Sequence, residues 1–305
     1  MLVWIPFADG RDLMGDLPDD VDVDVWDGRG DLPPGADRVE VVVPPWWPKE
    51  AVTSTLGRLP SLRLVQMVNA GVDWIVGSIP DGVTLCNAGD VNAREVAEWV
   101  MAVTLSHLRQ LPRFAAAQAA GEWRPALTST LRRRRVVVVG HGSIGRALVA
   151  MLEPFDAEVT VVARTARAGV EPVERLPELA TTADALLVVA ALTEGTRGLV
   201  DAALLSRLPD GALVVNVGRG PIVRTDDLLA ELTAGRLHAA LDVTDPEPLP
   251  DGHPLWGAPN LVLTPHVGGG TTNFMANAFG LVGDQVRRLA AGEDVRFRID
   301  PADYR

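Results

Sequence analysis

The stretch Val136–Gly145, which reads VVVVGHGSIG, decides the fold. Four consecutive valines predict a strand that is buried on both faces, and the pattern Gly140-x-Gly142-x-x-Gly145 follows it directly. A helical pattern begins within this loop and continues to Leu152. In this order, backbone N–H groups and the helix dipole meet a pyrophosphate. The stretch therefore predicts a dinucleotide-binding domain, in which the three glycines allow a tight turn, phosphate approach and helix–strand packing, in that order.

Short apolar runs recur on both sides of this stretch, and they predict two parallel sheets. In the second half of the chain, near-continuous Val and Leu runs alternate with helical patterns, as in a doubly wound sheet. A less regular series in the first 90 residues predicts another unit of the same class. The expected strands are 2–7, 21–26, 39–43, 62–68 and 83–86, then 136–139, 159–163, 185–190, 213–217, 239–243 and 261–263. We therefore expect an α/β protein with two Rossmann-like domains.

Two helical segments set the domain boundaries. The segment 94–120 is apolar around nearly its whole circumference, which predicts one helix buried on several sides. It is either a central helix of one chain or the seam of a homodimer, and we favour the dimer. A second helical segment, from about Thr271 to Ala291, follows the last strand and is expected to return to the first unit. The predicted domains are thus 1–92 with 272–305, and 93–271.

Composition narrows the classes of function. A chain of 305 residues with 47% hydrophobic residues suits two medium cores, and its formal charge of −12 disfavours nucleic acid and anionic lipid as partners. The single cysteine, Cys86, forms neither a disulfide framework nor a thiolate metal cluster within one chain, and it fits a reducing, cytoplasmic setting. The N-terminal apolar run ends after Phe7, which is too short for a signal sequence or a membrane span. We expect a cytoplasmic protein with a small-molecule substrate.

The strand after the glycine loop indicates which dinucleotide is bound. An NAD-specific fold places an acid about 20 residues after the glycines, but here Arg164, Thr165 and Arg167 follow the strand 159–163. Two guanidinium groups and a hydroxyl suit recognition of a 2′-phosphate. We therefore expect NADP in preference to NAD, with solvation of a strand end as the alternative. For His141, inside the loop, a contact with the cofactor is left open.

Three later strand ends carry polar groups that an apolar sheet does not need. Arg219 stands between two glycines, Glu247 between two prolines, and His266 in a Gly-rich turn beyond the last strand. Singly, each would be interpreted as structural, but ligands of open α/β sheets lie at the carboxyl ends of strands. Together they predict hydride transfer to a 2-keto acid without a metal. His266 would supply the proton, Glu247 would orient the His266 ring, and Arg219 would bind the substrate carboxylate and carbonyl. The other histidines outside the loop are interpreted as structural: His107, His238 and His253.

Over nearly its full length the chain resembles the D-isomer-specific 2-hydroxyacid dehydrogenase family. The segments that carry this resemblance are Asn69–Asp73, Glu95–Glu98, the glycine loop, Asn216–Gly220, Leu241–Val243, Pro246–Pro248 and Thr264–His266. The resemblance implies a substrate-binding domain made from both chain ends, a nucleotide-binding domain in the middle, and usually a dimer. In lacking the acid that would bind the ribose, the sequence resembles the NADPH-using glyoxylate and hydroxypyruvate reductases of the family. Phosphoglycerate and formate dehydrogenases are less similar, because their terminal extensions are absent from this sequence.

The resemblance also implies roles for individual residues. Arg219, Glu247 and His266 would be catalytic, and Asp242 would hold the nicotinamide carboxamide. We expect substrate contacts from Ala70, Gly71 and Val72 through the backbone, from Trp47 and from Arg219. We expect cofactor contacts from Val100, Gly140, Gly142, Ser143, Ile144, Gly145, Arg164, Thr165, Leu192, Val217, Asp242, His266 and Gly268. Ala191 replaces a proline that is frequent in the family, and we expect only a local change in that loop.

The predicted function is the reduction of a small 2-keto acid, of glyoxylate or hydroxypyruvate type, to the D-2-hydroxy acid with NAD(P)H. One alternative is a dinucleotide-sensing protein of the corepressor type. Another is the same fold acting on a different substrate, such as D-lactate or D-3-phosphoglycerate. Trp46 and Trp47, which follow a strand of the first unit, favour a small or apolar 2-substituent, with plain packing as the alternative.

Overall fold

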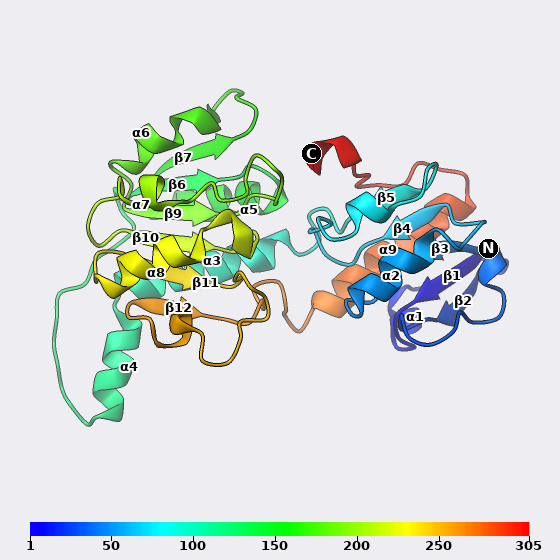
Figure 1. Cartoon of the computed structure of the whole chain (residues 1–305), viewed down its shortest axis with the longest axis horizontal. Helices are drawn as coiled ribbons and strands as arrows, with labels where there is room; N and C mark the ends of the chain where they lie inside the picture. Colours follow the sequence, from blue (N-terminus) through cyan, green and yellow to red (C-terminus); the bar gives the residue numbers. More distant parts are fainter. Residues whose placement is uncertain (305) are drawn as a thin grey trace. The chain divides into compact units, whose positions relative to one another are not determined.

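A computed structural model describes residues 1–304 and separates the chain into two compact units. The first contains Met1–Asn92 together with the residues from Thr272 onward, and the second contains Ala93–Thr271 (Figure 1). Both are α/β units built on a wholly parallel sheet, so the predicted fold class is confirmed. Which unit binds substrate and which binds dinucleotide stays a prediction at this point.

The first unit is a five-stranded sheet with helices on both faces. Its strands are β1 (Leu2–Ile5), β2 (Asp22–Val25), β3 (Val39–Val42), β4 (Leu64–Gln66) and β5 (Thr84–Cys86), and its helices are α1 (Gly10–Leu13), α2 (Lys49–Leu56), α9 (Phe274–Ala290), η1 (Ala36–Arg38), η2 (Val76–Ser78) and η7 (Pro301–Tyr304). The strand order is β2-β1-β3-β4-β5. Val52 and Leu56 of α2 pack on one face, and Phe279 and Val286 of α9 pack on the other. The helix near the C-terminus therefore completes a unit that the N-terminus begins.

The second unit is a seven-stranded sheet, also covered on both faces. Its strands are β6 (Arg135–Val139), β7 (Glu158–Ala163), β8 (Glu171–Pro172), β9 (Ala185–Val188), β10 (Leu213–Asn216), β11 (His238–Leu241) and β12 (Leu261–Leu263). Its helices are α3 (Ala93–Leu108), α4 (Leu111–Ala119), α5 (Ser143–Leu152), α6 (Leu176–Ala180), α7 (Ala202–Leu205), α8 (Thr225–Thr233), η3 (Glu153–Phe155), η4 (Val173–Arg175), η5 (Gly220–Ile222) and η6 (Pro254–Gly257). The strand order is β12-β11-β10-β9-β6-β7-β8.

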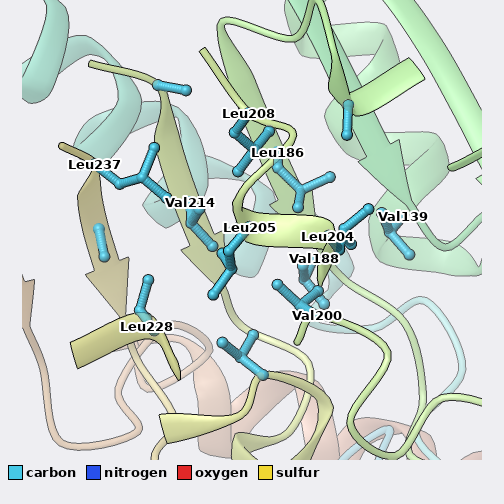
Figure 2. Packing of buried hydrophobic residues seen from close by; sticks show 14 of the residues in the cluster. Val139, Leu186, Val188, Val200, Leu204, Leu205, Leu208, Val214, Leu228 and Leu237 are labelled. Carbon is cyan, nitrogen blue, oxygen red and sulfur yellow. The ribbon is translucent and has the colours of Figure 1, made fainter. Parts of the chain in front are cut away.

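Burial of the central strands on both faces explains their near-continuous valine and leucine runs. Val137 and Val139 of β6 belong to a cluster with α6, α7 and α8, part of which is drawn in Figure 2. Val136 and Val138 belong to a second cluster, with α3 and α5, on the opposite face. Because successive side chains of a strand point to opposite faces, a strand covered twice needs apolar residues at every position.

The single helix predicted over 94–120 is wrong, because the structure divides it into α3 and α4. The break lies at Gln110, whose φ of 53° is left-handed, and Pro112 occupies the first turn of α4. A proline lacks the N–H that a continuing helix would use, so it fits the first turn of a new helix but not the interior of a long one. Ala102 of α3 is exposed in the single chain, and its burial by a second subunit stays a prediction.

Smaller differences concern the ends of strands. Most strands are a residue or two shorter than their apolar runs, and the two-residue edge strand β8 was not predicted. Its sequence, Glu171-Pro172, lacks the apolar pattern of a strand, and it makes only two register pairs with β7. Within residues 1–304, no helix has both the length and the apolar character needed to cross a membrane.

Candidate active site

The glycine loop joins β6 to α5, as the sequence predicts, and its glycines have different surroundings. Gly140 has a φ of 114°, and a Cβ there would lie 2.8 Å from the backbone N of Ala190. A Cβ on Gly145 would lie against the carbonyl oxygen of Gly140, so this glycine lets α5 approach the strand. By contrast, nothing lies within 4 Å of a Cβ on Gly142, the residue that precedes α5. Open space at a helix N-terminus fits the pyrophosphate predicted there.

Beyond β7, a guanidinium lies beside the glycine loop. Nη2 of Arg167 is 2.6 Å from Nδ1 of His141 and donates to the carbonyl oxygen of His141 at 3.3 Å. Nη1 of Arg146 donates to the same carbonyl oxygen, also at 3.3 Å. Partial burial and the two nearby guanidinium charges lower the pKa of His141. Arg164 and Thr165, which the sequence singles out, are exposed in the same connection after β7.

A turn organised by Asn216 presents Arg219 at the end of β10. The buried Asn216 accepts a hydrogen bond from the N–H of Gly218 through Oδ1 and donates from Nδ2 to the carbonyl oxygen of Arg219. A Cβ on Gly220 would collide with the carbonyl oxygen of Thr244, so the loops after β10 and β11 are packed together. This role of Asn216 is missing from the sequence interpretation, although an asparagine two residues before a glycine is a signal for such a turn.

Glu247 and His266 are in direct contact. Nδ1 of His266 lies 2.6 Å from Oε1 of Glu247, and both side chains are partly exposed. Since Glu247 occupies Nδ1, Nε2 is the ring nitrogen left to face a substrate. His266 itself has a φ of 55°, a left-handed conformation that is uncommon for a non-glycine residue. The sheet order places β10, β11 and β12 side by side, so Arg219, Glu247 and His266 follow three neighbouring parallel strands.

Asp242, which directly follows β11, holds the turn that carries His266. Its Oδ1 accepts hydrogen bonds from Oγ1 of Thr264 at 2.5 Å and from the N–H of Val267 at 2.8 Å, and its Oδ2 accepts from the N–H of Gly268 at 2.8 Å. The carbonyl oxygen of Asp242 also accepts from the N–H of His266. Only 3% of Asp242 is exposed. The contact of Asp242 with nicotinamide stays a prediction, whereas its hydrogen bonds to the turn around His266 were not predicted from the sequence.

In the first unit, the segment predicted to bind substrate follows β4. The carbonyl oxygens of Asn69 and Ala70 accept hydrogen bonds from the N–H of Ala88 and from Nδ2 of Asn87. The C=O and N–H of one trans peptide point in opposite directions, so the N–H groups of Ala70 and Gly71 face away from these partners. Ala70 is exposed and Val72 is fully buried. Trp47, which follows β3, is 56% exposed.

The remaining predicted cofactor residues have varied surroundings. Val100 of α3 is fully buried in the apolar cluster that this helix forms with the sheet, and Val217, directly after β10, is 7% exposed. Leu192 is half-buried after β9, and a Cβ on Gly268 would lie 2.9 Å from Oδ2 of Asp242. Ser143 and Ile144 begin α5. Contacts of these residues with a dinucleotide stay predictions, and a contact by the Val100 side chain would require its neighbours to move.

The histidines interpreted as structural have structural contacts. The rings of His107 and His238 pack with their centroids 4.5 Å apart, and burial lowers the pKa of His107 to about 4. Nδ1 of His253 accepts a hydrogen bond from the N–H of Leu255 at the start of η6. Among residues 1–304, no group of three or more His, Cys, Asp or Glu side chains gathers as a metal site would require.

This fold and this arrangement of arginine, glutamate and histidine define a dinucleotide-dependent dehydrogenase. Residues 101–268 match the family described as D-isomer specific 2-hydroxyacid dehydrogenase, NAD binding domain. The chain belongs to this family, and it is an NAD(P)-dependent dehydrogenase. The family resemblance seen in the sequence is thereby confirmed.

Similar proteins extend the match beyond this domain. Glyoxylate/hydroxypyruvate reductase A HPR2 of Arabidopsis thaliana is 35% identical over 222 residues, which are 70% of this chain and 70% of that protein. A D-isomer specific 2-hydroxyacid dehydrogenase of Xanthobacter autotrophicus Py2, solved with NADPH and MES, has a TM-score of 0.87 at 31% identity, over 100% of this chain and 99% of the other. An NADPH-dependent glyoxylate/hydroxypyruvate reductase of Sinorhizobium meliloti, solved with NADP and sulfate, has a TM-score of 0.84 at 26% identity, over 98% of each chain.

Proposed function

We propose that this enzyme uses NADPH to reduce small 2-keto acids of the glyoxylate or hydroxypyruvate type to D-2-hydroxy acids. The observation that carries the proposal is the 2.6 Å contact between His266 and Glu247, at the carboxyl ends of strands next to the one that delivers Arg219. Hydride addition to a ketone needs a proton donor and a fixed cation, and this set contains both. The relatives named as glyoxylate/hydroxypyruvate reductases support the substrate class.

Each catalytic residue has a separate role. The nicotinamide, when bound, supplies the hydride. Nε2 of His266 gives its proton to the carbonyl oxygen of the substrate as the C=O bond becomes a C–O–H group. Glu247 stabilises the imidazolium and fixes the ring through Nδ1. Arg219 binds the substrate carboxylate and polarises the adjacent carbonyl, and its planar guanidinium suits both oxygens. Within the first unit, the outward N–H groups of Ala70 and Gly71 are donors of the kind that binds a carboxylate.

The cofactor preference is supported by cations beside the glycine loop. Gly142 and Ser143 would hold the pyrophosphate at the N-terminus of α5. Arg164 and Thr165 follow β7, and the guanidinium of Arg167 is held against His141. A guanidinium suits a phosphate, and no acid competes for the ribose in Arg164–Arg167. The structures of relatives with NADPH or NADP bound support the same choice, with NAD as a poorer substitute.

A steady-state assay tests the proposed function. Purified protein is mixed with NADPH and glyoxylate, hydroxypyruvate or pyruvate, and the nicotinamide absorbance is followed. We expect turnover with at least the first two acids, the D-enantiomer of glycerate as the product from hydroxypyruvate, and a higher kcat/KM for NADPH than for NADH. Absence of turnover with all three acids, or no effect of His266→Ala, would overturn the proposal.

We further propose that the enzyme is a cytoplasmic homodimer. Trp123 and Leu127, in the connection between α4 and β6, are 96% and 97% exposed. Aromatic side chains such as Trp are enriched in the buried centres of subunit interfaces, and a second subunit would cover both residues. Sedimentation velocity should show a dimer for the natural protein and a monomer for the double variant Trp123→Ser, Leu127→Ser. Cell fractionation tests the location, which the single buried thiol of Cys86 supports.

A further inference from the structure

Lys49 is unusual because it is the only lysine in the sequence. The chain has 28 lysine and arginine residues together, and the other 27 are arginine. A protein that uses arginine at every other cationic position has a lysine at the first residue of α2. An ammonium is a compact charge on a flexible stem, whereas a guanidinium is a flat fork, so the two are not equivalent at a confined position.

Two indoles hold the ammonium of Lys49. Nζ lies 4.8 Å from the ring centroid of Trp47 and 5.7 Å from that of Trp74. The negative faces of aromatic rings attract a cation at such distances, and this attraction uses none of the three N–H donors in a conventional hydrogen bond. Lys49 and Trp74 are half-buried, and Trp47 is 56% exposed. The indoles thus fix the cation while leaving its donors for a ligand.

The position of this trio is next to the segment predicted to bind substrate. β3 and β4 are neighbouring parallel strands, so the segments that follow them leave the same edge of the sheet. Trp47 and Lys49 come after β3, and Ala70 and Gly71 come after β4. Trp74 directly follows the segment Asn69–Asp73, and Nζ of Lys49 lies 5.7 Å from its ring centroid. The indole that contacts the ammonium therefore belongs to the same connection as Ala70 and Gly71, four and three residues after them.

We propose that Lys49 binds a second anionic group, a carboxylate or phosphate, at the far end of the 2-keto acid. This inference rests on the proposed function and extends its substrate class to 2-keto acids with a second anion. It also gives the exposed indole of Trp47 a different role from the one expected from the sequence. Trp47 holds the cation that selects a charged tail, and it does not favour an apolar one.

Kinetics of charge-matched substrates test the proposal. Wild-type enzyme is assayed with NADPH and four acids: glyoxylate and pyruvate, which lack a second anion, and oxaloacetate and 3-phosphohydroxypyruvate, which carry a carboxylate and a phosphate. At least one of the two dianions should have the highest kcat/KM, and comparing them identifies the preferred anion. Lys49→Met should raise the KM for that dianion about tenfold and change the KM for glyoxylate less than twofold. Lys49→Arg should recover part of the loss, and Arg58→Met, at an exposed position just after α2, should change nothing.

Chemical protection gives a readout that does not depend on turnover. Because the chain has one lysine, an amine-directed reagent modifies only Lys49 and the N-terminus, and peptide mass spectrometry separates the two. D-malate, which has a second carboxylate, should slow modification of Lys49, whereas D-lactate should not.

Two outcomes would overturn the proposal: equal changes in KM for dianions and glyoxylate in Lys49→Met, or equal protection by D-malate and D-lactate. A wild-type enzyme that prefers pyruvate to both dianions would also overturn it. Each of these results leaves glyoxylate reduction intact and so differs from a failure of the proposed function, in which no acid is reduced.

Discussion

Replacing Asp242 by asparagine should disturb the active site without removing any catalytic group. The carboxylate accepts three hydrogen bonds, two at Oδ1 and one at Oδ2, from the residues on either side of His266. In Asp242→Asn, the best orientation keeps an oxygen toward Thr264 and Val267. The new amide nitrogen then faces the N–H of Gly268, so two donors meet and that buried N–H loses its acceptor.

The magnitude follows from these bonds. A hydrogen bond to a charged group contributes about 1.5–3 kcal/mol, and weakening of the two remaining bonds by loss of the charge adds to this. We expect Asp242→Asn to lower the free energy of unfolding by about 2–4 kcal/mol. Thr264→Val removes one donor and leaves Oδ1 with the N–H of Val267, so its cost should be only about 1 kcal/mol. Asp251→Asn, in an exposed turn, is the control and should cost nothing measurable.

Two assays measure the effect of Asp242→Asn. Chemical denaturation gives the change in stability, and steady-state kinetics with glyoxylate and NADPH give kcat and KM. A displaced His266 should lower kcat about ten- to a hundredfold, because proton transfer depends on its position. The KM for glyoxylate should change less than threefold, since the substitution removes no group that is proposed to bind the carboxylate. Wild-type stability together with a kcat within twofold of wild type would refute the reasoning.

Four further predictions follow from single contacts. His266→Gln should lower kcat about 10²–10⁴-fold, and Glu247→Gln about tenfold, measured with saturating glyoxylate; equal activity of either variant and wild type would contradict the assignment. Arg167→Ala should raise the KM for NADPH about tenfold and leave the KM for NADH unchanged. An equal rise in both KM values would mean that Arg167 supports the glycine loop and does not bind the 2′-phosphate. The pKa of His107, lowered to about 4 by burial, lies below that of the unfolded chain, so stability should fall as pH drops from about 6.5 to 4. His107→Phe should remove up to about 2 kcal/mol of that fall in denaturation curves at several pH values, less than the full shift because the ring is partly exposed.

The strands of the second sheet could be predicted because each needs apolar residues on both faces. Runs such as Leu213–Val217 have no other common explanation, and their spacing left room for helices between them. The break between α3 and α4 was harder, because the apolar pattern continues through Leu111 and Phe114. Pro112 signals the break, because a proline within a helical pattern ends or kinks the helix, and the prediction of one helix gave this signal too little weight.

The site could be predicted in its residue types but not in its supporting bonds. Arg219, Glu247 and His266 stand out only as a set, because together at strand ends they supply the cation, the carboxylate and the proton donor of one reaction. Asn216 and Thr264 do not stand out, since their function lies in which backbone groups they contact. The contact of Lys49 with Trp74 joins positions 25 residues apart and depends on two neighbouring strands ending at one edge.

The conformation of His266 links these supporting bonds to the chemistry. A left-handed backbone costs a non-glycine residue about 1–2 kcal/mol, and it persists only when surrounding bonds hold it. Asp242 supplies them by binding the N–H groups of His266, Val267 and Gly268, one through its carbonyl oxygen and two through its carboxylate. Asp242 thus fixes the backbone of this turn, and the contact with Glu247 sets the rotation of the His266 ring. The buried acid that the sequence assigned to the cofactor is therefore also the residue that aims the proton donor.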